Sequence, residues 1–228
     1  MIGIIGAMDQ EIKAYLNLAQ NIKEIVWHNI IFYRATLCNK EVCIVKSGVG
    51  KVLSATICQK MIDEFLPSTI IFTGVAGALN STYNIGDIII STDLMQHDMD
   101  ATLLGCKHGQ VPYSDYHIFR ADGNLIDISK TIKVDGHNIH FGRILTGDTF
   151  VSSQDSKRKF FIDELKGDAV EMEGAAIAQV CTLNKIPYVV VRTISDKADG
   201  EACENFEAFL PQVADNSSKV VSQLLQKF

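Results

Sequence analysis

The sequence has little of several features that mark specialised protein classes. Only 4 prolines occur among its 228 residues, and 47% of the residues are hydrophobic, which excludes collagen-like and disordered chains. Basic residues are also few: 21 lysines and arginines stand against 27 aspartates and glutamates, giving a formal net charge of −6. Sequence-independent affinity for nucleic acid needs clustered positive charge. We therefore expect no nucleic-acid partner.

The 6 cysteines contain no CxxC pair and no zinc-ligand spacing, so we expect buried, reduced thiols and no metal. Such cysteine usage is typical of a cytoplasmic protein. No apolar run approaches the roughly 18 residues that a membrane-spanning helix needs. The apolar segment 1–8 lacks a basic region and continues into polar residues, which argues against a secretory signal. We predict a cytoplasmic protein with no membrane partner.

Short runs rich in β-branched residues alternate with segments of helical period, the pattern of an α/β layer fold. The segment 93–123 is polar and irregular, which is typical of a lid or an interface. With no repeat or linker in the sequence, we predict a single domain spanning residues 1–228. Predicted strands cover 2–5, 26–37, 41–45, 69–73, 87–91, 142–146, a short run ending at 172, and 188–194, and those at 26–37 and 41–45 form a predicted hairpin that turns at Asn39 and Lys40. Predicted helices cover a segment capped by Asp9, then 52–65, 155–165, 174–183 and about 204–226.

The glycine-rich and histidine-rich segments do not match cofactor motifs. In 47–51, a phosphate-binding P-loop would need Gly at Val45 and Ser or Thr at Val52, and a dinucleotide fingerprint would need Gly at Leu53. The pairs in 97–100 and 137–140 are two-residue clusters that chance often produces, and we interpret them as solvated loops. We therefore expect no bound nucleoside triphosphate, no NAD and no other cofactor.

Three acids follow predicted strands. Glu11, Glu173 and Asp196 each lie just beyond the carboxyl end of a strand, which is where ligands bind in open α/β sheets. Taken singly, each acid is also explained as a helix-cap or first-turn residue. Their joint placement favours convergence on one pocket.

Six segments carry a family resemblance that extends over essentially the whole chain. They are GIIGAMDQE from Gly3, SGVGKV from Ser47, TGVAG from Thr73, GDTFV from Gly147, VEMEGA from Val170 and RTISD from Arg192. Together they resemble the 5′-methylthioadenosine/S-adenosylhomocysteine nucleosidases of the nucleoside phosphorylase/hydrolase superfamily. The resemblance implies a three-layer α/β/α domain with a central mixed β-sheet. It also implies a homodimer in which 93–123 contributes to the partner's site.

The resemblance implies a hydrolase of methionine salvage that releases adenine from methylthioadenosine or S-adenosylhomocysteine, leaving methylthioribose or S-ribosylhomocysteine. Asp196 would protonate adenine N7, and Glu11 would activate the attacking water. Each such group is worth about 10²–10⁴-fold in rate. Asp196 would have to carry a proton near neutral pH, which demands burial or a supporting hydrogen bond. Ser195 is the neighbour from which we expect that bond.

Glu173 would accept hydrogen bonds from both ribose hydroxyls, because one carboxylate offers two oxygens to two vicinal donors. Arg192 would lie near the attacking water, and it is also interpretable as a buried ion-pair partner of one of these acids. Phe150 would stack on the purine. The other implied substrate-binding residues are Met8, Val49, Gly77, Val151, Met172 and Phe206.

Three departures from the family pattern bear on substrate choice. Val75 replaces a common serine, Leu104 and Cys106 replace aromatic residues of the 5′-alkylthio pocket, and Phe72 stands where related phosphorylases carry a phosphate-binding arginine. The last favours hydrolysis. The segment 96–100 also resembles that of 6-amino-6-deoxyfutalosine hydrolases of the menaquinone pathway. That activity, a purine nucleoside phosphorylase and a non-catalytic nucleoside-binding module remain alternatives.

Overall fold

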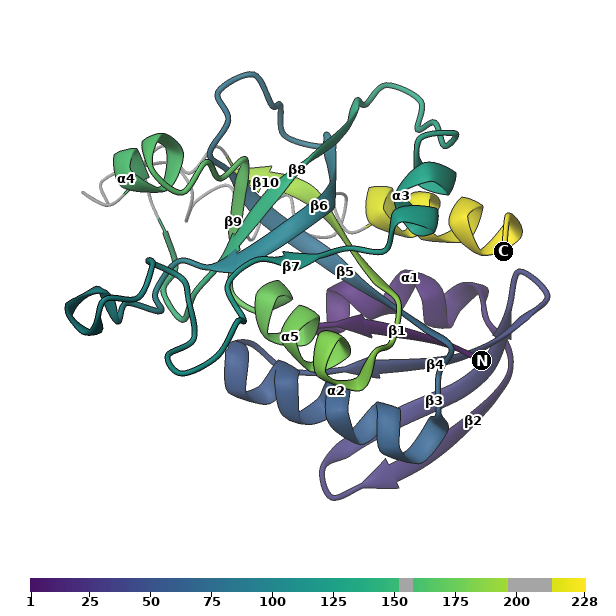
Figure 1. Cartoon of the computed structure of the whole chain (residues 1–228). Coiled ribbons are helices and arrows are strands. Elements are labelled where there is room, and N and C mark those ends of the chain that lie inside the picture. Colours follow the sequence, from purple (N-terminus) through teal and green to yellow (C-terminus); the bar gives the residue numbers. More distant parts are fainter. Residues whose placement is uncertain (152–157, 197–214) are drawn as a thin grey trace.

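The computed structural model describes residues 1–151, 158–196 and 215–228, which form one mixed β-sheet with helices on both faces (Figure 1). The strands are β1 (Ile2–Gly6), β2 (Gln20–Trp27), β3 (Ile30–Leu37), β4 (Lys40–Lys46), β5 (Thr69–Ala78), β6 (Ile88–Gln96), β7 (Phe119–Arg120), β8 (Ile139–Thr146), β9 (Ala169–Glu171) and β10 (Tyr188–Asp196). The helices are α1 (Asp9–Leu18), α2 (Lys51–Phe65), α3 (Gly123–Ser129), α4 (Arg158–Asp163) and α5 (Gly174–Asn184), with a further helical segment at 215–226.

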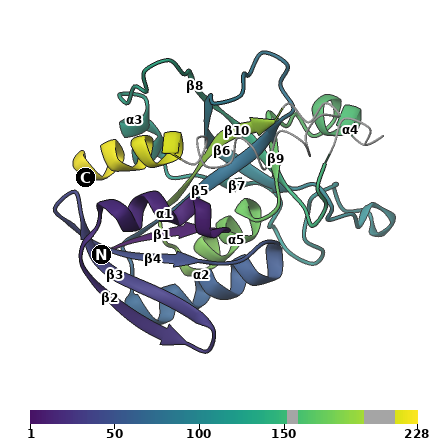
Figure 2. The same cartoon turned by 180° about the vertical axis from the view of Figure 1, so that it is seen from behind.

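The layers agree with the predicted three-layer α/β/α architecture. Helices α2 and α5 pack together on one face of the sheet, while α1 and the segment 215–226 lie on the other (Figures 1 and 2). Strands β5 and β10 are buried along their whole lengths. Strands covered on both faces are expected to be near-continuous apolar runs, as the sequence of β10 is up to Val191.

The sheet closes on itself in its second half. Its order is β10-β6-β8-β9-β5-β1-β4-β3-β2, and β10 also pairs with β5, so five strands form a ring from which β1, β4, β3 and β2 extend. The carboxyl ends of β1, β4, β8, β9 and β10 face one region beside residues 75–77, in the carboxyl-terminal part of β5. This arrangement positions the pocket described below.

The N-terminal half departs from the sequence prediction at its hairpins. The predicted strand 26–37 is two strands, because His28 adopts a positive φ of 53° and turns the chain between β2 and β3. The predicted β3–β4 hairpin is confirmed, but Cys38 and Asn39 carry its positive φ values of 50° and 61°. Two successive left-handed residues favour a tight hairpin turn, which lies one residue earlier than predicted.

The segment 93–123 is only partly irregular. Strand β6 continues to Gln96 and pairs with the short β7, and a 3₁₀ helix covers Thr102–Leu104. The predicted helix at 204–226 is observed over 215–226, and its earlier part lies outside the described residues, as does the start of the predicted helix 155–165. Within the described ranges, no helix is long and apolar enough to cross a membrane.

Candidate active site

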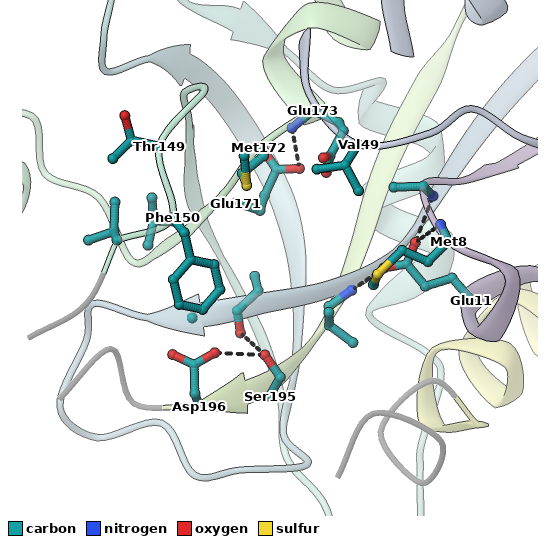
Figure 3. Close-up of a pocket in the computed structure, with 16 residues that line it drawn as sticks. Met8, Glu11, Val49, Thr149, Phe150, Glu171, Met172, Glu173, Ser195 and Asp196 are labelled. Atoms are coloured by element: carbon teal, nitrogen blue, oxygen red, sulfur yellow. Dashed lines mark hydrogen bonds between the residues drawn. The ribbon is translucent and has the colours of Figure 1, made fainter. Parts of the chain in front are cut away.

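A pocket of about 200 Å³ opens where these strand ends meet (Figure 3). The structure brings nearly all the predicted site residues together there. Arg192 is the described exception, since it lies buried behind the pocket wall, and Phe206 falls outside the described residues. The lining residues are Ala7, Met8, Glu11, Val49, Val75, Ala76, Gly77, Thr149, Phe150, Val151, Val170, Glu171, Met172, Glu173, Ser195 and Asp196.

Helix α1 positions Glu11, although its start differs from the prediction. The N-cap is Met8, whereas Asp9 is the first helical residue and forms an exposed ion pair with Lys46 at 2.8 Å. Glu11, at the third helical position, reaches back to accept the Met8 amide at 2.9 Å. The acid three residues after the N-cap thus satisfies one of the unpaired amides of the helix start.

The Glu11 carboxylate is held by three backbone amides. Besides the Met8 amide, Oε2 accepts the Ala7 amide at 2.6 Å, and Oε1 accepts the Val75 amide at 3.1 Å. Burial raises the pKa of Glu11, while the Arg192 charge and the three amides oppose this. A fixed carboxylate of raised pKa is suited to take a proton near neutral pH.

Arg192 is fully buried, and its interpretation as an ion-pair partner is confirmed. Its Nη2 lies 2.5 Å from Glu171 Oε2 and 3.4 Å from Glu173 Oε2. The guanidinium also lies 3.9 Å from the centre of the Phe72 ring, within range of a cation–π interaction. Burial works to lower the pKa of Arg192, but the charges of Glu171, Glu11 and Glu173 together raise it. Arg192 therefore stays charged beneath three carboxylates.

The main partner of Arg192 was missed by the sequence analysis, which assigned no role to Glu171. The Glu171 carboxylate also accepts hydrogen bonds from the Thr146 hydroxyl and from the amides of Glu173 and Gly174. It therefore satisfies amides at the start of α5. A signal existed: a buried arginine needs a compensating charge, and Glu171 shares its strand face with Glu173, two residues on.

Glu173 is the N-cap residue of α5 and is 6% exposed. Its Oε1 accepts the Gly50 amide at 2.9 Å. Burial and then the neighbouring charge of Glu171 raise the pKa of Glu173 to about 8, against the opposing effects of Arg192 and the Gly50 amide. A carboxylate has about four acceptor positions, so Glu173 retains capacity for donors from a ligand.

A β-bulge places Ser195 and Asp196 together. The pairing of β10 with β5 shifts between Ile194, opposite Ala76, and Asp196, opposite Gly77, which leaves Ser195 as the extra residue. Successive side chains of a regular strand point to opposite faces, yet both Ser195 and Asp196 line the pocket. The Ser195 hydroxyl donates to Asp196 Oδ2 at 2.8 Å, so the expected hydrogen bond is present.

The rest of the pocket is mainly apolar. Phe150 is 46% exposed and lies beside Asp196 in Figure 3, whereas Met172 lies between Phe150 and Glu173. Val151 is buried. An apolar pocket with a few convergent polar groups is typical of a small-molecule site.

The three departures noted in the sequence have defined positions. The Val75 side chain packs with Met8, and its backbone still binds Glu11. Leu104 is 65% exposed at the end of the 3₁₀ helix, and Leu104 and Cys106 do not line the pocket. Phe72 is buried beneath Arg192. A side chain at position 72 therefore contacts the guanidinium and not the open cavity.

The histidine and cysteine segments pack into the fold. The predicted solvated loop at 97–100 was wrong for His97, which is 5% exposed and packs against Phe161. Cys58 and Cys181 are buried with their sulfurs 3.8 Å apart between α2 and α5, as the packing interpretation predicts. Across the residues that the structure describes, no cluster of three or more His, Cys, Asp or Glu side chains is arranged to hold a metal ion.

Comparisons with known proteins agree with this geometry. The family model described as Phosphorylase superfamily matches residues 1–226. The 5′-methylthioadenosine/S-adenosylhomocysteine nucleosidase of Staphylococcus aureus (strain JH9) is 40% identical over 228 residues, which is the whole of both chains. The chain therefore belongs to the phosphorylase superfamily and, within it, to the family of 5′-methylthioadenosine/S-adenosylhomocysteine nucleosidases.

Two solved structures share the fold closely. The nucleosidase of Neisseria meningitidis in complex with methylthio-immucillin-A has a TM-score of 0.94 at 35% identity, with 100% of this chain and 99% of that chain covered. The futalosine hydrolase of Helicobacter pylori strain 26695 has a TM-score of 0.92 at 34% identity, with 100% and 97% covered. A nucleosidase and a futalosine hydrolase therefore share this fold, so the fold alone does not distinguish the two activities.

Proposed function

We propose that this protein hydrolyses the N-glycosidic bond of 5′-methylthioadenosine and S-adenosylhomocysteine, releasing adenine and methylthioribose or S-ribosylhomocysteine. The observation that carries the proposal is the distribution of acids in one pocket. Glu11 lies at one end, Asp196 and Phe150 lie at the other, and Glu173 lies above the space between them (Figure 3). The names of the full-length relatives support the same substrates.

The base and its proton donor occupy the Phe150 end of the pocket. Phe150 stacks on adenine, with the Val151 backbone at its edge, and Asp196 delivers a proton to N7 so that adenine departs neutral. The Ser195 hydroxyl lies 2.8 Å from Asp196 Oδ2 and 3.3 Å from the Ala76 carbonyl oxygen. Ser195 is the donor in both contacts, and because a hydroxyl has one proton it donates to one of the two oxygens at a time. When Asp196 carries the proton that the proposed reaction requires, Ser195 accepts from Asp196 and donates to Ala76.

The sugar and the water occupy the other end. Glu173 accepts the 2′- and 3′-hydroxyls, Met172 lies against the ribose, and Gly77 lets the ligand approach the β5 backbone. Glu11 takes a proton from water as it attacks C1′. The buried Arg192 lies behind these carboxylates and holds Glu171 and Glu173 in place.

Two features favour water over phosphate as the nucleophile. Phosphate-binding sites are built from arginine, lysine or converging amide donors, yet no lysine or arginine is among the described residues that line the pocket. The nearest guanidinium, that of Arg192, is stacked on Phe72 and bound to Glu171. A purine nucleoside phosphorylase is therefore disfavoured.

A 6-amino-6-deoxyfutalosine hydrolase is the second candidate. It is favoured by the segment 96–100 and by the structural similarity to the futalosine hydrolase of Helicobacter pylori. Both activities use the same acids and differ at the 5′ substituent, so a comparison of kcat/KM on the three nucleosides decides between them.

The direct test follows adenine release from methylthioadenosine with and without phosphate. We expect equal rates, and strict dependence on phosphate would contradict hydrolysis. Glu11→Gln and Asp196→Asn should each lower kcat by about 10²–10⁴-fold while folding normally. Absence of adenine release from the wild type would favour a non-catalytic binding module.

We further propose that the chain is a single nucleosidase domain, that it is a cytoplasmic enzyme of methionine salvage, and that it acts as a homodimer. The support for a dimer is a set of exposed apolar side chains: Val52 is 76% exposed, Leu103 101% and Tyr113 97%. Exposed apolar side chains mark an interface where they form one contiguous patch, so these three are the candidate contacts with a second copy. Sedimentation equilibrium should give twice the chain mass of 25.1 kDa, and a monomer would contradict the proposal.

A further inference from the structure

Lys51 belongs to a P-loop-like segment that binds no nucleotide in the proposed reaction, yet its side chain is extensively bonded. Its Nζ donates to Asp98 Oδ1 at 2.7 Å and to Gln96 Oε1 at 3.1 Å. Gln96 in turn donates to Gln179 on α5 at 2.7 Å. The first residue of α2 is therefore joined to the end of β6 and to α5.

A second set of bonds joins the same residues to the loop after β8. The Lys51 amide donates to Asp148 Oδ1 at 2.8 Å, and the Asp148 amide donates to Asp98 Oδ2 at 3.0 Å. The three residues thus form a closed ring of hydrogen bonds across three loops, which we call the 51–98–148 clasp. The Lys51 charge and the Asp148 amide hold the pKa of Asp98 below its usual range, although burial opposes them.

The clasp lies next to the middle and the Phe150 end of the ligand pocket. Gly50, the residue before Lys51, donates its amide to Glu173, and Phe150 follows Asp148 by two residues. Gly50 has a φ of 96°, a conformation that favours glycine. Lys51 follows Gly50 directly, so bonds that fix Lys51 also restrain the orientation of the Gly50 amide.

We propose that Lys51 is a positioning residue for substrate binding, and that the 51–98–148 clasp fixes the Gly50 amide on Glu173 and the Phe150 loop over the purine. This inference rests on the proposed function. The Lys51 and Asp98 side chains are 19% and 26% exposed, so the pair is screened in part. We expect loss of the Lys51–Asp98 pair to weaken ground-state binding of the nucleoside about tenfold, while Asp196 and Glu11 stay in place.

The test compares Lys51→Met with Lys51→Arg and with a control, Lys60→Met. Lys60 lies on the same helix with a side chain that is 27% exposed, and it pairs with Glu64 at 2.8 Å, away from the pocket. We expect Lys51→Met to raise KM for methylthioadenosine about tenfold with kcat within about threefold. Lys51→Arg should recover most of the loss, because it keeps the charge, and Lys60→Met should behave as the wild type. An unchanged KM, or no recovery by arginine in a folded protein, would overturn the proposal.

Binding of an unreactive carbon-linked analogue of methylthioadenosine separates this proposal from the proposed function. Wild-type turnover tests the nucleosidase activity, whereas analogue affinity tests the clasp even if turnover is absent. Asp98→Asn should lower the affinity for the analogue as Lys51→Met does. The double variant should bind the analogue no more weakly than Lys51→Met alone. Additive losses would show that the two residues act separately and would contradict the clasp.

Discussion

Burial, followed by the charge of Glu171 two residues away, raises the pKa of Glu173 to about 8, which lies within the working range of pH. Below about pH 8 one oxygen of Glu173 carries a proton, and a neutral carboxyl group accepts hydrogen bonds less well than a carboxylate. A ribose that donates two hydroxyls must therefore favour the ionised form.

The affinity for a nucleoside should rise with pH as Glu173 ionises. For an unreactive methylthioadenosine analogue, we expect affinity relative to that of free adenine to increase about tenfold between pH 7 and 9, in proportion to the ionised fraction. Adenine is the control because it has no ribose, and Glu173→Gln should show a flat ratio. Isothermal titration calorimetry on the two ligands measures this, and a pH-independent ratio in the wild type would contradict the ribose role.

The acids that we propose to bear the chemistry were predictable because their types and spacings are local properties of the sequence. Glu11, Glu173 and Asp196 each follow a strand, and all three line the pocket. Glu171 was not predicted, since its role depends on Arg192, which is 21 residues away. Pairing across that distance is decided by which strands become neighbours.

At the scale of elements, the β5–β10 pair holds the site in register. Gly74 on β5 lies opposite Arg192 on β10. A Cβ added to Gly74 would overlap both Glu11 Oε1 and Arg192 Nη1. The absence of a side chain is therefore what lets the carboxylate of α1 and the guanidinium of β10 approach the same point of β5.

Gly74→Ala should displace Glu11 and Arg192 and lower kcat by at least about 10²-fold, the scale for loss of a positioned base. The matched control is Gly123→Ala at the start of α3, where an added Cβ meets no atom within 4 Å. Initial-rate kinetics with circular dichroism compare the two variants. Activity near that of the wild type in a folded Gly74→Ala protein would show that this approach is not required.

Element existence was predicted better than element length. Strand β2 was missed for most of its length because its residues are largely polar and exposed, so they lack the alternation that marks a half-buried strand. Strand β6 continues through Asp93 to Gln96, although its polar residues resemble a loop, because β7 and β8 pair with it. The Ser195 bulge is likewise a product of pairing, since no local pattern marks an extra residue.

At the scale of the whole molecule, ring closure is the feature that sequence periodicity could not reveal. Alternating strands and helices predict a layered α/β fold, but they do not state that β10 pairs with both β5 and β6. That double pairing buries Arg192 and places Asp196 beside the end of β9. The three-layer prediction was correct, and the closure within it is what gathers the acids.

The shifted pKa values of four acids in the folded protein should make the stability of the ligand-free protein depend on pH. Glu11 and Glu173 have raised pKa values in the folded protein, so their contribution is fully present below about pH 4.5 and is lost as pH rises through the folded values, about 8 for Glu173. Asp87 and Asp98 have lowered pKa values, so their contribution is present above about pH 4 and is lost as pH falls. The two effects together predict a stability maximum between about pH 4 and 4.5.

Glu173→Gln should flatten the decline above that maximum. Glutamine keeps an acceptor for the Gly50 amide but never ionises beside Glu171. Relative to the wild type, the variant should gain at least about 2 kcal/mol between pH 5 and 8, since a pKa raised from 4.5 to about 8 represents roughly 5 kcal/mol at about 1.4 kcal/mol per pKa unit. That gain corresponds to about 4–8 °C in Tm for a chain of this size. Differential scanning calorimetry of the ligand-free protein measures it, with the surface variant Glu64→Gln as control. Parallel Tm profiles for the wild type and Glu173→Gln would mean that Glu173 is already ionised throughout this range, and that burial in the closed ring does not hold its proton.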